Sequence, residues 1–279
     1  MTIMYVVMSV LAMATCSSLQ ALTKTDAISF KTKSVVKSEL SHPHLMQGLK
    51  VHDVSVYEPH MGELRIYRGV SFKDVLNKIY GKEWSKYEEI LFTCKDGYQP
   101  SVPLAKVKNH DAYLVFARQS GSFIIDNKLQ NKVNVDLGPY YLVWENIKNQ
   151  AIRADGVGDW PYQIVGIDLI MFADKFKKLA PAKNSSQKVI KGFLAFRNHC
   201  MRCHSINGEG GTLGIELNYP ASVTEYWKED WLKKWIIDPS QIRHKTTMPG
   251  LKEVATNAAQ LSDDIVTYLK SMAKHKQKP

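Results

Sequence analysis

The feature that most restricts what this chain can be is a histidine that directly follows the second of two closely spaced cysteines. Cys200 and Cys203 are separated by Met201 and Arg202, and His204 comes next. Two thiols one helical turn apart can reach two carbons along one edge of a porphyrin, while the adjacent imidazole reaches the iron from the same side. We therefore predict one covalently attached haem c, with Cys200 and Cys203 as its anchors and His204 as the proximal iron ligand.

Three other interpretations of the cysteine pair compete with haem attachment. A thioredoxin-like redox pair would be expected in a βαβ context and would make no use of the histidine. A zinc site would need two further Cys or His ligands at similar spacing, and none follows closely. A disulfide framework fits poorly, because a chain without its leader would keep an odd number of cysteines, namely Cys94, Cys200 and Cys203. Haem attachment accounts for both thiols and for the imidazole, and we favour it.

The second axial ligand is expected to be Met248. This methionine lies in the polar segment HKTTMPG, where a thioether has no apolar periodicity to satisfy, and Met/His ligation is one common arrangement of a c-type haem. Met201 lies inside the attachment motif, and Met272 belongs to the apolar stripe of the last predicted helix. His244 is the alternative, since a second imidazole would also give a six-coordinate iron.

The 279 residues are enough for two domains of ordinary size. Residues 22–44 are polar and lack periodicity, and we expect a flexible lead-in there. Residues 45–173 mix alternating and helical patterns, which predicts an α+β domain with a mixed sheet. Residues 174–186 are charged and contain Pro, Ser and Asn, which is typical of a linker. Residues 187–279 have helical patterns throughout, which predicts an all-α domain.

Local signals predict several element boundaries. Ser71 is a suitable N-cap and Gly81 a suitable end for one helix. The Asp96-Gly97 turn between two β-like runs predicts a hairpin. In the last helix, Ser262 is the expected cap.

Residues 187–279 resemble the class I cytochrome c domain. In that family the first and last helices cross at a small residue, here Gly192. The sequence differs from the family pattern at Ile215. At this position the family usually has a proline, whose carbonyl accepts a hydrogen bond from the proximal histidine N–H. Any residue offers a carbonyl, so the bond is still expected. The matching features are Gly192, Phe196, the attachment motif, the GEGGTLG loop, WLKKWIIDP, MPG and Tyr268.

The sequence gives weaker indications of a role in haem binding for two other side chains. We expect Trp235 and Arg243 to contact the haem, on a propionate. His199, just before the motif, is expected to be a surface residue.

Residues 64–145 resemble the later part of a sulfite-oxidase-type molybdopterin domain, through the YRGVSFKDVL, DGY and GPYYLVW segments. That family has its molybdenum-ligating cysteine upstream, and this chain has none between Cys16 and Cys94. Cys94 is expected to be a small buried hydrophobe. The resemblance therefore implies the fold without molybdopterin. Four residues are candidates for the lining of a remnant pocket: His52, His60, Asp96 and Tyr98.

Residues 1–21 contain no charged side chain and include an apolar run shorter than a membrane span, which predicts a cleaved signal peptide and a periplasmic, bacterial protein. A retained leader or lipidation of Cys16 is the alternative, and either would attach the protein to the membrane.

The formal net charge of +10 favours an acidic redox partner protein, while no recognition motif for nucleic acid is present. The leading hypothesis is an exported monohaem cytochrome that carries single electrons rather than an enzyme, with the α+β domain used for docking. A molybdopterin-dependent oxidoreductase with a fused cytochrome and a haem-based ligand sensor are the alternatives.

Overall fold

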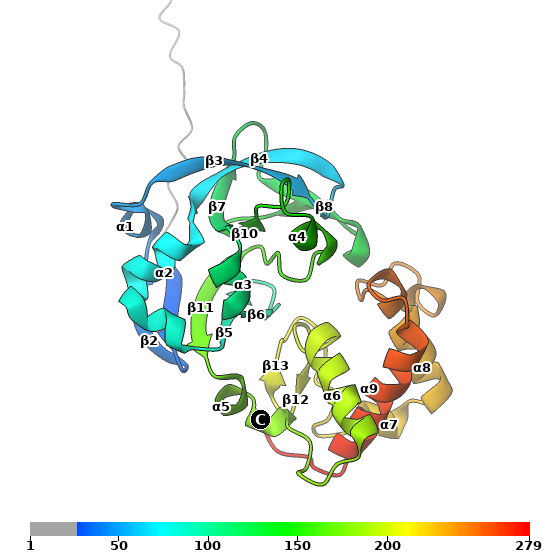
Figure 1. Cartoon of the computed structure of the whole chain (residues 1–279). Helices are drawn as coiled ribbons and strands as arrows, with labels where there is room; N and C mark the ends of the chain where they lie inside the picture. Colours follow the sequence, from blue (N-terminus) through cyan, green and yellow to red (C-terminus); the bar gives the residue numbers. More distant parts are fainter. Residues whose placement is uncertain (1–26) are drawn as a thin grey trace, which may run out of the picture.

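The computed structural model describes residues 27–279, which form two parts joined by a short helical segment (Figure 1). One hydrophobic core lies among residues 28–169, and a second collects almost entirely residues 170–272. The predicted signal peptide and Cys16 lie outside the described residues. Within residues 27–279, no helix combines the length and apolar character that crossing a membrane requires.

The first part contains a five-stranded mixed sheet. Its strand order is β2-β1-β11-β5-β6, and β1 pairs in parallel with β11 while the other pairs are antiparallel. The strands are β1 (Ile28–Thr32), β2 (Val35–Leu40), β5 (Glu89–Cys94), β6 (Ser101–Pro103) and β11 (Ile164–Ile170). The prediction of a flexible lead-in over residues 22–44 is wrong where the structure describes it, because Ile28 and Phe30 are fully buried against β11.

A four-stranded antiparallel sheet packs over the same core, in the order β10-β7-β4-β3. Its strands are β3 (Val51–Glu58), β4 (Glu63–Ser71), β7 (Ala112–Arg118) and β10 (Tyr141–Trp144), and a separate hairpin comprises β8 (Ile124–Asn127) and β9 (Lys132–Asp136). The helices of this part are α1 (His42–Met46), α2 (Phe72–Tyr80), η2 (Gly81–Lys86), α3 (Leu104–Asn109), η3 (Lys128–Gln130) and α4 (Gln150–Ala154). The α+β class and the mixed sheet are confirmed.

For helix α2 and the β5–β6 hairpin, local sequence signals were sufficient to predict the structure. The Ser71 hydroxyl accepts a hydrogen bond from the Asp74 backbone N–H at 3.4 Å, and Gly81 at the C-cap has a φ of 61°. β5 and β6 pair antiparallel on either side of the Asp96-Gly97 turn, where Gly97 has a φ of 89°. Both predicted boundaries of α2 and the predicted hairpin are confirmed.

The segment predicted as a linker is packed rather than free. It starts inside α5 (Phe172–Lys175) and contains η4 (Lys177–Leu179). Phe172, Phe176 and Leu179 are buried in the core of the second part, and the Tyr268 hydroxyl donates to the Leu179 carbonyl at 2.7 Å. The second core therefore begins before residue 174, where the linker was expected to start.

The second part consists mainly of helices: α6 (Gln187–His199), α7 (Val223–Tyr226), α8 (Glu229–Ile237), η5 (Pro239–Gln241), η6 (Leu251–Glu253) and α9 (Ala258–Met272). A pair of two-residue strands, β12 (Ser205–Ile206) and β13 (Glu209–Gly210), is added to the expected all-α fold. Helices α6 and α9 cross (Figure 1) at Gly192, where an added Cβ would lie 2.0 Å from the Asp264 carbonyl oxygen. Ser262 does not cap α9, because the helix starts at Ala258 and the Ser262 hydroxyl donates to the Lys233 carbonyl at 3.2 Å.

Candidate haem site

The two cysteines of the attachment motif lie in the turn that ends α6. The Cys200 backbone N–H donates to the Phe196 carbonyl at 2.8 Å, and the N–H groups of Cys203 and His204 both donate to the Cys200 carbonyl, at 3.0 and 2.9 Å. This turn brings both thiols and the imidazole into one short loop. Neither thiol forms a disulfide. Burial raises the pKa of Cys200 to about 12 and that of Cys203 to about 11, so both are neutral thiols near pH 7.

His204 is held in one orientation by a backbone carbonyl. Its Nδ1 lies 2.8 Å from the Ile215 carbonyl oxygen, the bond expected despite the absence of proline at that position. Gly214 lies flat against the ring, since an added Cβ would lie 2.4 Å from the His204 Cε1. Burial lowers the pKa of His204, which favours the neutral ring. With Nδ1–H donating to a carbonyl, Nε2 is the nitrogen available to bind a metal.

Met248 is positioned by two hydrogen bonds from its own part of the chain. The Trp235 indole N–H donates to the Met248 sulfur at 3.0 Å, and the Met248 backbone N–H donates to the Thr246 hydroxyl at 3.2 Å. A thioether sulfur has two lone pairs, so one remains for a metal when the other accepts from Trp235. The hydrogen bond from Trp235 to Met248 was not predicted from the sequence, from which a contact between Trp235 and a haem propionate was expected. The Trp227 and Trp235 rings pack with centroids 5.6 Å apart.

Arg243 and His244 do not share in this arrangement. Both side chains are exposed in the loop that precedes Met248. Among residues 27–279, neither side chain takes part in a hydrogen bond. The loop is joined to the first part by the Thr246 carbonyl, which accepts from the Asn131 side chain at 2.6 Å. The contact between Arg243 and a haem propionate stays a prediction.

The donor set fits a c-type haem. It offers two unpaired thiols, an imidazole with Nε2 free, and a thioether that keeps a lone pair, which is the chemistry needed for two thioether bonds and two axial ligands. A separate metal site is not evident: among the described residues, no three His, Cys, Asp or Glu side chains come together around a common point. Cys200 and Cys203 would hold the porphyrin, and His204 and Met248 would bind its iron.

The first part of the chain contacts the attachment loop through the β5–β6 turn. The Thr212 N–H donates to the Gly97 carbonyl at 2.9 Å, and the Gln99 N–H donates to the Arg202 carbonyl at 2.8 Å. The Arg202 guanidinium also donates to the Tyr98 hydroxyl at 3.3 Å. The turn was predicted from the sequence, but its contact with the attachment loop was not. Nothing in either segment alone shows that the two segments meet.

An ion pair between Arg197 on α6 and Glu89 on β5 lies beside this contact. The Glu89 carboxylate is nearly buried, and the Arg197 guanidinium also lies over the Phe172 ring, 3.6 Å from its centroid. A charge pair shielded in this way is screened less by salt than an exposed pair. It therefore joins the two parts on the side where α6 leads into the attachment motif.

Three of the four candidates for a remnant pocket line a cavity between the two parts. His60, Asp96 and Tyr98 share a cavity of about 640 Å³ with Cys203 of the attachment motif. His52 lies elsewhere, with its ring 5.8 Å from the Tyr113 ring. His199, expected on the surface, is half-buried and lines the same cavity.

Cys94 is buried in the core of the first part, as expected for a small hydrophobe. Burial raises the pKa of its thiol well above the usual value, which keeps it neutral. The thiol therefore has the environment of a packing residue.

Comparison with known proteins supports the assignment of the second part. No curated protein matches the sequence. The family model described as cytochrome c matches residues 189–273, a stretch that contains most of α6, the attachment motif, Met248 and all of α9. This match implies covalently bound haem c and supports a haem-based electron-transfer role. The C-terminal part of the chain, residues 189–273, is a cytochrome c domain.

Proposed function

We propose that this protein is an exported, periplasmic monohaem c-type cytochrome that passes single electrons to or from an acidic redox partner protein. When bound, haem c supplies an iron that changes between the ferric and ferrous states, one electron at a time. The net charge of +10 supports the choice of an acidic partner, since opposite charge raises the rate of encounter.

The observation that carries the proposal is the arrangement of the attachment loop. His204 is oriented by the Ile215 carbonyl at Nδ1, its Nε2 makes no hydrogen bond within residues 27–279, and the two neighbouring thiols are unpaired. Orientation of this kind fixes the tautomer and raises the basicity of a metal-binding imidazole. Trp235 similarly fixes the sulfur of Met248 through its N–H, which makes Met248 the proposed distal ligand.

The first part of the chain is proposed to serve in docking, without a cofactor of its own. Support comes from its mixed sheet, from the burial of Cys94, and from the backbone bonds that join Gly97 and Gln99 to the attachment loop. We also propose that it is a degenerate relative of the sulfite-oxidase-type domain, on the segments within residues 64–145. Metal analysis tests whether this part lacks molybdopterin, because a molybdopterin enzyme with a haem would contain molybdenum as well as iron.

Protein matured in a periplasm with a functional haem-attachment system is expected to carry one covalently bound haem per chain. A pyridine haemochrome spectrum combined with a protein concentration gives this ratio directly. A haem that is extracted by acidic acetone would contradict the proposal, since thioether bonds survive that treatment. A ratio of two would contradict the monohaem assignment alone.

Replacing Met248 with alanine is expected to remove the weak far-red band that Met–iron ligation gives in the oxidised spectrum, and to lower the reduction potential. The reason is that the thioether ligand favours the ferrous state. Optical spectra and a potentiometric titration measure the two effects. Carbon monoxide should also bind the reduced variant and not the parent protein.

Met272→Leu provides a matched control, because Met272 is a buried core residue of α9 and the substitution conserves volume. This variant should keep the band and the potential of the parent. If the band survives in Met248→Ala, Met248 is not the distal ligand, and His244→Ala then tests the alternative. If carbon monoxide binds the parent protein readily, the sensor hypothesis is favoured.

A further inference from the structure

The side chain of Arg202, which lies between the two attachment cysteines in the sequence, is held by both parts of the chain. Its Nη2 donates to the Asn198 carbonyl at 2.7 Å, near the end of α6, and its Nη1 donates to the Tyr98 hydroxyl at 3.3 Å. The Gln99 N–H binds the Arg202 backbone carbonyl at 2.8 Å. Two consecutive residues of the β5–β6 turn therefore fix both the side chain and the backbone of Arg202.

The first part also orients the hydroxyl that Arg202 binds. The Tyr98 hydroxyl donates to the Gly158 carbonyl at 3.0 Å, which leaves its oxygen to accept from Arg202. Gly158 lies directly against the guanidinium, since an added Cβ would lie 2.0 Å from Nη1. The lack of a side chain at Gly158 is therefore what lets the guanidinium lie at this place.

The positive charge of Arg202 is permanent, and its hydrogen-bond acceptors are neutral. A guanidinium keeps its proton at every pH at which a protein is folded. Its two acceptors are a phenol oxygen and a peptide carbonyl. The Asp159 carboxylate also acts on Arg202, but it forms an ion pair with Lys106 at 2.8 Å. The charge of Arg202 thus has no counter-charge of its own within the described part of the chain.

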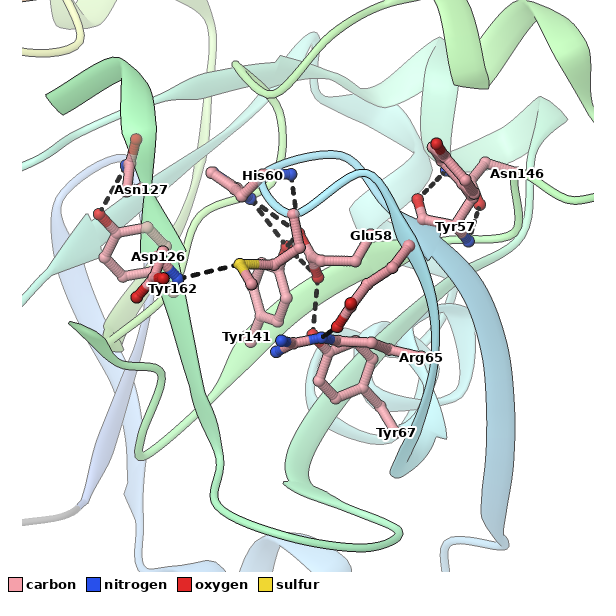
Figure 2. Close-up of polar contacts among 12 residues, drawn as sticks. Tyr57, Glu58, His60, Arg65, Tyr67, Asp126, Asn127, Tyr141, Asn146 and Tyr162 are labelled. Carbon is pink, nitrogen blue, oxygen red and sulfur yellow. Dashed lines mark hydrogen bonds and ion pairs between the residues drawn. The ribbon is translucent and has the colours of Figure 1, made fainter. Parts of the chain in front are cut away.

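The buried charge of Glu58 in the first part has the opposite arrangement. The Glu58 carboxylate lies 2.8 Å from His60 Nδ1 and accepts from the Tyr67 and Tyr141 hydroxyls at 2.7 and 3.0 Å (Figure 2). Burial would raise the pKa of Glu58, but the bonds and charge from His60 lower it. A charge with its counter-charge beside it has a weak field at a distance, whereas the field of Arg202 is not cancelled in this way.

The charge of Arg202 acts on both side chains that would hold the porphyrin. Burial raises the pKa of the Cys200 and Cys203 thiols, and the Arg202 charge opposes that rise at both. The field of Arg202 therefore extends along the attachment edge. Because reduction adds one negative charge at the iron, a fixed positive charge beside the attachment edge favours the reduced state.

We propose that the first part of the chain raises the reduction potential of the haem by holding the charge of Arg202 in place beside the two attachment cysteines. Tyr98 and Gly158 are positioning residues that act through Arg202, and Arg202 acts through its charge. The first part then helps to set the driving force of electron transfer, in addition to docking. This inference rests on the covalent haem of the proposed function.

The test is a potentiometric titration of the haem-attached full chain at constant pH and ionic strength. Arg202→Gln should lower the equilibrium constant for reduction about tenfold, which is about 59 mV for a one-electron couple. Arg202→Lys keeps the charge and should retain most of the parent potential. Lys191→Gln is the matched control, because it removes one charge from an exposed position of α6, where solvent and salt screen it, and it should keep the parent potential.

Tyr98→Phe and Gly158→Ala change the first part and leave the attachment motif intact. Tyr98→Phe removes the acceptor of Nη1, and Gly158→Ala displaces the guanidinium, so each should lower the potential by part of the Arg202→Gln shift. Combined with Arg202→Gln, neither should lower the potential further, because both act through Arg202. The far-red band of the oxidised spectrum should persist in every variant, which separates the effect from a loss of Met248.

Four results would each overturn the proposal. They are an Arg202→Gln potential equal to that of Lys191→Gln, an Arg202→Lys potential as low as that of Arg202→Gln, parent potentials in both Tyr98→Phe and Gly158→Ala, and an undiminished Gly158→Ala shift in the Arg202→Gln background. All four leave the electron-carrier function standing. A parent chain without covalent haem would overturn that function and this inference together.

Discussion

The double variant Cys200→Ser, Cys203→Ser is expected to contain no covalently attached haem. A hydroxyl does not form the thioether bond, and the two free thiols beside His204 are the proposed anchors. Haem staining after denaturing electrophoresis should fall from a strong band to background. Each single variant should keep at most one thioether bond, which shifts the reduced pyridine haemochrome band.

Cys94→Ala supplies the control for loss of a thiol. Cys94 is buried in the core of the first part, so the substitution costs on the order of 1 kcal/mol in stability and leaves the stain intact. Persistent staining of the double variant at the level of the parent would mean that the haem is attached elsewhere or that the motif has another use. Loss of the stain in Cys94→Ala would show that this residue also matters for attachment.

Gly192→Ala is expected to destabilise the cytochrome domain by about 2 kcal/mol, although alanine is the better helix former. The new methyl group would lie 2.0 Å from the Asp264 carbonyl oxygen and 2.8 Å from the Tyr268 Cβ, so α6 and α9 must separate. Backbone atoms cannot move aside as the end of a flexible side chain can. For a domain of about 100 residues this lowers the melting temperature by about 10 °C. Thermal unfolding of the haem-attached protein, followed by circular dichroism, measures the shift.

Lys191→Ala is the matched control, because it places alanine at an exposed position next to Gly192 on the same helix. Its melting temperature should stay within about 2 °C of the parent, since surface substitutions usually change stability by under about 0.5 kcal/mol. A Gly192→Ala protein as stable as this control would mean that α6 and α9 do not meet at Gly192.

The sequence predicted the features that short-range chemistry determines. The attachment motif, the Ser71 cap, the Gly81 helix end and the Asp96-Gly97 turn each depend on a few adjacent residues. The Ile215 carbonyl was expected to accept from His204 because every residue has a carbonyl, and the loop brings it within 2.8 Å. Where the determinant was local, the expected structure was found.

The errors concern contacts between distant segments. β1 looked like a flexible lead-in because its pairing partner, β11, follows much later in the chain, and Ser29 lies opposite Gly166. The bond from the Trp235 N–H to the Met248 sulfur was not predicted, because nothing in α8 shows that the two groups meet. Ser262 fits the pattern of a cap, but the tertiary bond to the Lys233 carbonyl holds it inside α9. Periodicity and propensity do not encode such pairings.

The buried residues of α5 and η4 determine how the cytochrome domain can be prepared on its own. A fragment starting at Gln187, the first residue of α6, would lack Phe172, Phe176 and Leu179 and would expose the apolar surface they cover. It would also lose the carbonyl that the Tyr268 hydroxyl binds. Such a fragment would be prone to aggregate or to be degraded before haem insertion, whereas one that begins ahead of Ile170 retains nearly the whole of its core.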